Sequence, residues 1–117
     1  MKKFLLNQIK KLPKVELHCH LDGSIRTKSI IDQAKIDNIA IPSTQIGLLN
    51  SIVKIGENNS SLEEYLKKFE ITLSVMQSPD ALERFAFEFI EDVYEENVVY
   101  IEIRFSPILH INSGMTP

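Results

Sequence analysis

The feature that most constrains this chain is the segment KVELHCHLDG, residues 14–23. Its apolar side chains occupy every second position and it ends in glycine, which is typical of a β-strand. Because side chains on a strand alternate between its two faces, the segment predicts one apolar face and one polar face. The apolar face holds Val15, Leu17, Cys19 and Leu21. The polar face holds Glu16, His18 and His20, and Asp22 continues their parity if the strand extends that far.

His18 and His20 are candidate metal ligands. Residues two apart on a strand lie about 6.5–7 Å apart at Cα, so both imidazoles can lean toward one cation. Neutral imidazole nitrogen binds zinc at about 2.0–2.1 Å. The alternative for a bare His-x-His pair is two histidines that face solvent and bind no metal. Asp22 and Gly23, a carboxylate and a flexible backbone at the strand's end, favour the metal site.

Residues 12–24, LPKVELHCHLDGS, resemble the amino-terminal signature of the adenosine deaminases, zinc enzymes of the amidohydrolase superfamily that are built on a TIM barrel. The resemblance implies that His18 and His20 bind Zn²⁺, and that His20 and Asp22 contact the substrate. Relatives that act on free adenine tend to have Glu-Gly where this chain has Asp22 and Gly23. The resemblance therefore favours a purine nucleoside as substrate.

Length, charge and cysteine content predict one cytoplasmic domain over residues 1–117. The net charge of −3, with no basic stripe, argues against nucleic acid as a partner. The longest apolar runs are much shorter than a membrane span. The single cysteine, Cys19, excludes an internal disulfide and suits a reducing compartment. We expect Cys19 to be a small buried hydrophobic residue and not a ligand.

Apolar residues three or four apart predict several helices. They cover residues 2–11, 27–37, 61–76 and 78–97, with a shorter helix from about 41 to 49 and a loop at 56–60. Thr27 is the expected N-cap of one helix. Ser61 and Glu64 form a capping box at the start of another. Ser78 precedes a proline at the first helical position of the last one, and Asn97 is its expected left-handed end.

The helix that begins near residue 61 carries an apolar stripe. Helical spacing alone predicts that this stripe packs in the core. The pattern SLxxYLxxF, residues 61–69, also resembles the family segment whose apolar side chains close over the purine and ribose. The resemblance implies that the substrate pocket is walled by Leu62, Tyr65, Leu66 and Phe69. Tyr65 departs from the mammalian-type enzymes, which have phenylalanine there, and its hydroxyl needs a partner if it is buried.

Residues 98–105 predict a second strand, and residues 100–107 resemble the second barrel strand of the family. Two parallel strands joined by helices form a crossover unit. The predicted fold class is therefore α/β, an incomplete TIM-type (β/α)8 barrel that contains about two parallel strands and several helices. On the polar face of this strand, Glu102 or Arg104 either supports the metal ligands near Glu16 or forms a structural ion pair. His110 is interpreted as a loop histidine beyond the strand.

A complete TIM barrel typically has about 250 residues, so the resemblance implies the amino-terminal part of a larger enzyme. The family's His-Ala-Gly-Glu segment, which supplies another zinc ligand and the general acid, does not occur in the 117 residues. We therefore expect no catalytic residue in this chain, weak Zn²⁺ binding, and no turnover by the chain alone.

The implied reaction is the hydrolytic deamination of adenosine and deoxyadenosine to inosine and deoxyinosine. Two alternatives stay open. The first is an enzyme similar to adenine deaminase. The second is a non-catalytic chain with vestigial metal ligands. An incomplete barrel exposes strand edges and apolar helix faces, so we expect the isolated chain to self-associate.

Overall fold

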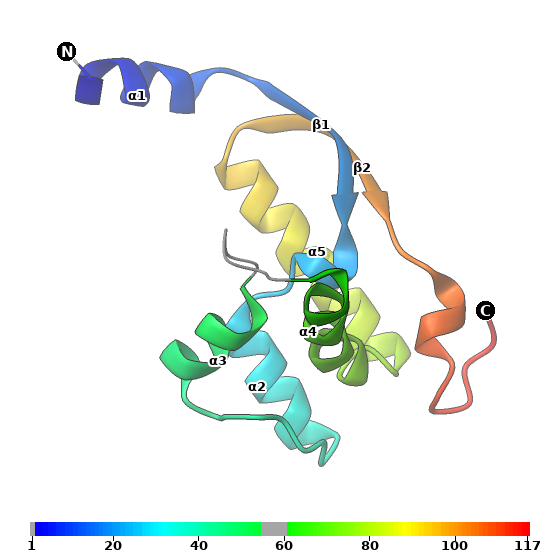
Figure 1. Ribbon diagram of the computed structural model, residues 1–117. Coiled ribbons are helices and arrows are strands. Elements are labelled where there is room, and N and C mark those ends of the chain that lie inside the picture. The colour runs from blue at the N-terminus through cyan, green and yellow to red at the C-terminus, as the bar shows by residue number, and fades with distance from the viewer. Residues whose placement is uncertain (1, 55–60) are drawn as a thin grey trace.

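The computed structural model describes residues 2–54 and 61–117, except for the side chains of Lys2, Lys3, Glu64 and Tyr65. The predicted loop at 56–60 and the predicted capping-box partner Glu64 therefore lie outside the described residues. The elements in chain order are α1 (Lys2–Lys11), β1 (Lys14–His20), the 3₁₀ helix η1 (Leu21–Gly23), α2 (Thr27–Ile36), α3 (Ile46–Val53), α4 (Leu62–Ser74), α5 (Pro79–Glu95), β2 (Val98–Arg104) and the 3₁₀ helix η2 (Pro107–His110) (Figure 1).

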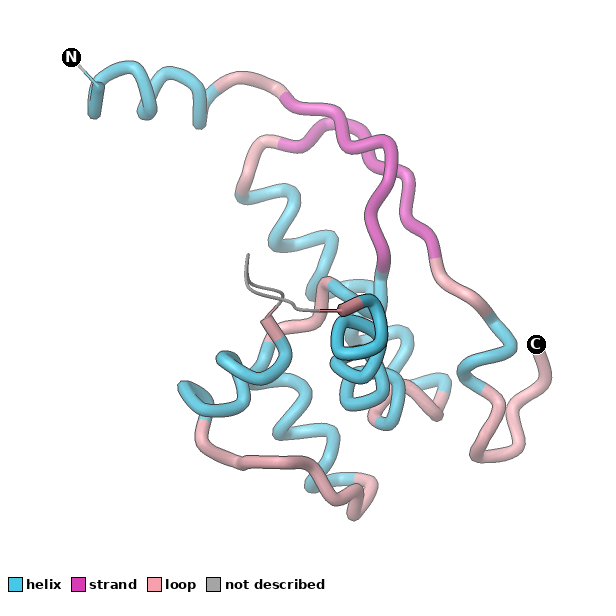
Figure 2. Tube along the Cα trace, viewed as in Figure 1, coloured by secondary structure: helices cyan, strands magenta, loops and turns pink. Residues whose placement is uncertain are grey.

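β1 and β2 lie side by side and form a parallel two-stranded sheet (Figure 2). The helices α2, α3, α4 and α5 occur between them in the chain. β1 runs directly into η1, which contacts α4 and α5. The prediction of an α/β arrangement with two parallel strands joined by helices is confirmed. This order places the carboxyl end of β1 against the helices.

Local sequence signals fix several element ends. The Ser78 side chain accepts a hydrogen bond from the Ala81 amide at 3.2 Å, so the predicted N-cap of α5 is confirmed. Asn97 follows α5 with φ of 60°, as predicted for a left-handed C-terminal residue. The Asn97 carbonyl accepts from the Lys14 amide at 2.8 Å, and its side-chain amide donates to the Lys10 carbonyl at 2.8 Å. One residue thus ends a helix and ties it to the start of β1.

Two predicted positions are wrong. The N-cap of α2 is Arg26, in extended conformation, and Thr27 is already the first helical residue. The short helix expected from about residue 41 begins only at Ile46. Gln45, its N-cap, is in extended conformation. The strand does not extend as far as Asp22, because the chain turns into η1 directly after His20.

The hydrophobic core is helical. Its buried apolar residues come from η1, α2, α3, α5 and the turn after α4, and they are Leu21, Ile30, Ile31, Ala34, Leu49, Val75, Met76, Ala81, Phe85 and Phe89. Cys19 packs against this core from β1, as predicted, although it is only partly buried. Val15 and Leu17, at the other end of the predicted apolar face, are 58% and 59% exposed. The core therefore supports only the carboxyl end of β1.

Arg26 ties the start of α2 to α5. Its guanidinium donates to the Asp92 carboxylate from Nη2 at 2.7 Å and from Nε at 3.0 Å. This hydrogen bonding, followed by the charge of Asp92, raises the pKa of Arg26 above its usual value. The bidentate geometry fixes the orientation of the segment that follows η1.

In the described part of the chain, none of the helices combines the length and apolar character that a membrane span requires.

Candidate metal and substrate site

A cavity of about 720 Å³ opens at the carboxyl ends of β1 and β2. Parallel-strand barrels build their sites at this end of the strands. The cavity is lined from η1, α4, η2 and both strands, by His18, Cys19, His20, Asp22, Gly23, Ser24, Leu66, Phe69, Leu73, Arg104, Phe105, Ser106 and Leu109. The structure therefore brings together five of the seven residues that the sequence suggested for metal or substrate: His18, His20, Asp22, Leu66 and Phe69.

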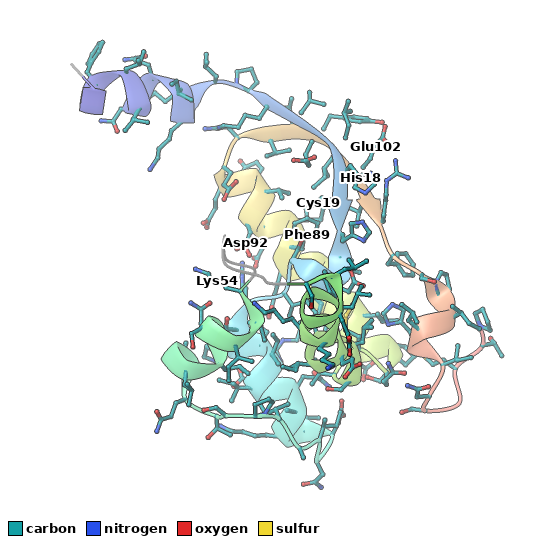
Figure 3. All side chains as sticks on the ribbon, in the orientation of Figure 1. His18, Cys19, Lys54, Phe89, Asp92 and Glu102 are labelled. Atoms are coloured by element: carbon teal, nitrogen blue, oxygen red, sulfur yellow. The ribbon has the colours of Figure 1, made fainter. Side chains whose placement is uncertain are left out.

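The two strand histidines converge. Nε2 of His18 lies 3.1 Å from Nε2 of His20, and the ring centroids are 5.1 Å apart with the planes inclined at 48°. Both side chains are exposed toward the cavity. In Figure 3, His18 lies on the side of the sheet that carries Glu102, whereas Cys19 points toward Phe89 of α5. The predicted alternation of faces thus holds at this end of β1.

The geometry of the histidine pair fits a shared metal ion. Two nitrogens that bind one tetrahedral Zn²⁺ at about 2.0–2.1 Å lie roughly 3.3 Å apart, and the observed separation is 3.1 Å. Imidazole nitrogen is also the donor type that zinc prefers alongside thiolate. Among the described residues, no group of three or more His, Cys, Asp or Glu side chains could hold a metal. The described residues therefore offer two nitrogen ligands, one short of a three-ligand catalytic zinc site.

Asp22 is the buried carboxylate of the site. Asp22 is 8% exposed and lies in η1, immediately after the buried Leu21. Within the described residues, Oδ1 has no hydrogen-bond partner, and it lies 3.8 Å from Nδ1 of His20. A buried carboxylate oxygen without a donor is costly, so this atom is suited to accept a hydrogen bond from a bound ligand.

α4 supplies an apolar wall. Leu66, Phe69 and Leu73 line the cavity from one side of the helix. A Cβ atom added to Gly23 would lie 3.3 Å from Cε1 of Phe69, so the missing side chain lets the aromatic ring approach η1. Leu62 is 72% exposed and is not among the lining residues. The side chain of Tyr65 lies outside the described residues.

Several lining residues were not singled out in the sequence. Leu73 continues the α4 stripe, so its helical spacing could have identified it. Phe105, Ser106 and Leu109 follow β2 and reach the cavity because the chain turns into η2. Arg104 lines the cavity and forms an ion pair with Glu102, with 3.7 Å between Nη2 and Oε2. This ion pair is a half-exposed contact within β2, and the support of the metal ligands by either residue stays a prediction.

His110, which was interpreted as a loop histidine, lies in a 3₁₀ helix and is buried. It is the last residue of η2 and is only 2% exposed. Its Nδ1 lies 3.0 Å from the Met76 carbonyl, and its ring lies 5.8 Å from that of Phe105. The nearby Gln77 side chain donates to the Leu109 carbonyl at 2.9 Å and accepts from the Asn112 amide at 3.0 Å. His110 therefore helps to fasten the segment that carries Leu109 to the turn between α4 and α5.

Comparison with known proteins gives a consistent result. The model of the family described as adenosine deaminase matches residues 13–117. An adenosine deaminase of Clostridium botulinum strain 657 is 54% identical over 106 residues, which are 91% of this chain and 32% of that protein. An adenosine deaminase of Shewanella woodyi is 50% identical over 105 residues, which are 90% of this chain and 32% of that protein. The chain thus spans about a third of the length of the curated relatives that it matches.

Solved structures support the fold. Arabidopsis ADAL complexed with GMP matches with a TM-score of 0.67 and 31% identity, over 86% of this chain and 29% of that one. An amidohydrolase from Burkholderia ambifaria with bound Zn matches with a TM-score of 0.71 and 27% identity. The match covers 92% of this chain and 29% of that one. These neighbours are of the amidohydrolase TIM-barrel type, so the predicted fold class, an incomplete α/β barrel, is confirmed.

Proposed function

This chain belongs to the adenosine deaminase family, and on that premise we propose that it is the amino-terminal part of a zinc-dependent enzyme. The proposed enzyme hydrolyses adenosine and deoxyadenosine to inosine and deoxyinosine, in purine metabolism. The observation that carries this proposal is the 3.1 Å approach of the His18 and His20 Nε2 atoms beside Asp22, whose buried Oδ1 has no hydrogen-bond partner among the described residues. The single cysteine supports a cytoplasmic location.

His18 and His20 would hold the metal through Nε2. A zinc ion at this position would supply Lewis acidity toward the water that attacks the purine. Each imidazole would bind the metal through the lone pair of its Nε2 atom. A Zn-bound amidohydrolase among the structural neighbours supports the assignment of this metal.

Asp22 would accept a hydrogen bond from a ribose hydroxyl. Its Oδ1 is buried and, within the described residues, has no donor. A hydroxyl group satisfies such an oxygen, whereas a phosphate in the same place would add a second negative charge to a poorly solvated carboxylate. This argues for a nucleoside, although ADAL proteins among the neighbours were solved with GMP or IMP.

The α4 wall would cover the purine. Leu66, Phe69 and Leu73 present apolar surface to the cavity, which excludes water from a planar base. We keep Leu62 and Tyr65 as proposed wall residues of the complete enzyme. His20 would also contact the substrate, because its ring lies between His18 and Asp22.

The 117 residues contain no His-Ala-Gly-Glu segment, so we propose that this chain alone binds Zn²⁺ weakly and does not catalyse turnover. The two free edges of the sheet and the exposed Val15, Leu17 and Val99 also favour self-association of the isolated chain. Sedimentation at several concentrations tests this point, and a monomer at all of them would contradict it.

The test of the function is a deaminase assay on the longest reading frame that contains these residues, with adenosine, deoxyadenosine and adenine as substrates. We expect both nucleosides to be deaminated, and Asp22→Ala to lower kcat/KM for nucleosides more than for adenine. A preference for adenine would favour the alternative enzyme. Failure with all three substrates would contradict the proposal, and turnover by the 117-residue chain alone would contradict its predicted inactivity.

A further inference from the structure

β1 is irregular at the place where its two histidines lie. The register passes from Glu16 opposite Ile101 to Cys19 opposite Ile103, so three steps along β1 match two steps along β2. One extra residue is therefore accommodated between Glu16 and Cys19. Such β-bulges bend a strand and change the direction of the side chains near them.

The bulge contains His18, and it matters for the histidine pair. On a regular strand, side chains two positions apart stand roughly parallel, with Cα atoms about 6.5–7 Å apart. Here the two Nε2 atoms approach to 3.1 Å and the ring planes are inclined at 48°. The extra residue therefore lies in the same segment of β1 as the His18 ring that approaches His20.

Glu16 holds this irregular segment from within the strand. Its Oε1 accepts a hydrogen bond from the backbone amide of His18 at 3.0 Å. The bond joins a charged acceptor to an amide inside the bulge, and charge-assisted bonds of this kind are stronger than neutral ones. Glu16 itself is exposed and contributes no side chain to the cavity lining.

We propose that Glu16 is a positioning residue, whose carboxylate fixes the bulge and thereby aims His18 at the metal shared with His20. This inference rests on the proposed function, because it assigns the histidine pair to a metal. Residues that orient metal ligands typically change metal affinity by about 10- to 100-fold when they are replaced. Glu16→Ala should weaken Zn²⁺ binding by about that factor, although Glu16 does not touch the metal.

Three variants separate positioning from simple charge. Glu16→Ala removes the acceptor and the charge, and Glu16→Gln removes the charge but keeps an oxygen that can accept from the His18 amide. Glu102→Ala removes a nearby negative charge on β2, where the carboxylate contacts Tyr100 and Arg104. The positioning role predicts weakened binding in Glu16→Ala alone. Weakening in all three variants would show a charge effect and overturn the proposal.

The experiment is an NMR titration of the chain with Zn²⁺ at fixed pH, which follows the imidazole resonances of His18 and His20 with buried His110 as an internal reference. Amide hydrogen exchange of His18, measured without metal, is the second readout. We expect faster exchange at His18 in Glu16→Ala and near-normal exchange in Glu16→Gln. Unchanged exchange in Glu16→Ala would overturn the role of Glu16. Absence of Zn²⁺ shifts in the unmodified chain would instead contradict the proposed metal site.

Discussion

The helical region and the strand region of this molecule differ in how their residues are held. The helical region, α2 to α5, contains nearly all of the buried apolar side chains, and Arg26 joins the start of α2 to α5 through Asp92. The strand region, α1, β1 and β2, contains no buried apolar residue among those described. The site lies where they meet, with Asp22 anchored beside the core and the two histidines on an exposed strand.

The difference predicts that stability and the proposed metal binding are separable in this chain. Folding free energy comes mostly from area buried by the helices. Under the proposed function, metal affinity would instead depend on the orientation of two exposed imidazoles, which contacts within β1 would set. Substitutions in the two regions should therefore have different readouts, and the predictions below test this separation.

The largest expected effect is in the core. Phe85 is 1% exposed, and Phe85→Ala should lower the free energy of unfolding by about 3–5 kcal/mol, because it removes buried area and leaves a cavity. Urea denaturation followed by circular dichroism measures this. The matched control on the same helix is Phe87→Ala, whose side chain is 66% exposed and which should stay within about 0.5 kcal/mol. Equal losses in both variants would break the distinction between buried and exposed faces.

The next effect compares two histidines. His110→Ala should lower the free energy of unfolding by about 1–3 kcal/mol, because it leaves the Met76 carbonyl without a buried donor. His18→Ala should change stability little, because its side chain is exposed, and should abolish Zn²⁺ binding. Denaturation and Zn²⁺ titration of both variants provide the comparison. If His110→Ala lost Zn²⁺ binding under conditions where this variant is still folded, stability and metal binding would not be separable between the two regions.

A smaller effect is expected at Gly23. A methyl group there would meet the Phe69 ring at 3.3 Å, so Gly23→Ala should push this part of the α4 wall away from η1. We expect a weaker affinity for a purine nucleoside in the complete enzyme, by a few-fold, with Zn²⁺ affinity unchanged. Inosine binding measured by calorimetry tests this. A loss of Zn²⁺ affinity as large as the loss of nucleoside affinity would show that the α4 wall and the histidine pair are coupled, and would contradict this prediction.

The smallest effect is a pH dependence on the helical surface. The hydrogen bond from Lys28, at 2.6 Å, and the pairing with Arg84 hold the pKa of Asp32 below its usual value of 3.8. Asp32 therefore stabilises the fold above pH 3.8, and this contribution is lost as the pH falls through its lower folded pKa. Asp32→Asn should flatten the pH profile of stability in that acidic range. Urea denaturation at a series of acidic pH values measures this, and an unchanged profile in Asp32→Asn would contradict the role of Asp32.

Much of the fold was predictable because its signals are local. Alternation identified β1 and β2, and Ser78 and Asn97 marked the ends of α5. The burial of His110 was not predictable, because it depends on the Met76 carbonyl, which is 34 residues away in the chain. The exposure of Val15 was missed because the register shifts between Glu16 and Cys19, so that Val15 stands opposite Tyr100 whereas Cys19 stands opposite Ile103, which packs against the core.

The candidate site was predictable in its residues but not in its geometry. The positions of His18, His20 and Asp22 followed from the motif, and the structure places all three at one cavity. The bulge was not visible, because an extra residue between Glu16 and Cys19 leaves the alternating sequence pattern intact. The lining by Phe105 and Leu109 depends on the turn into η2, which is not a periodic feature.

The most direct test of the central claim is a Zn²⁺ titration of the chain beside His18→Ala and His20→Ala, with circular dichroism to confirm folding. We predict weak binding of one Zn²⁺ per unmodified chain and its loss in both variants, because the two Nε2 atoms act together. Retained binding in either variant, or no binding by the unmodified chain, would contradict the assignment of a shared metal to this pair.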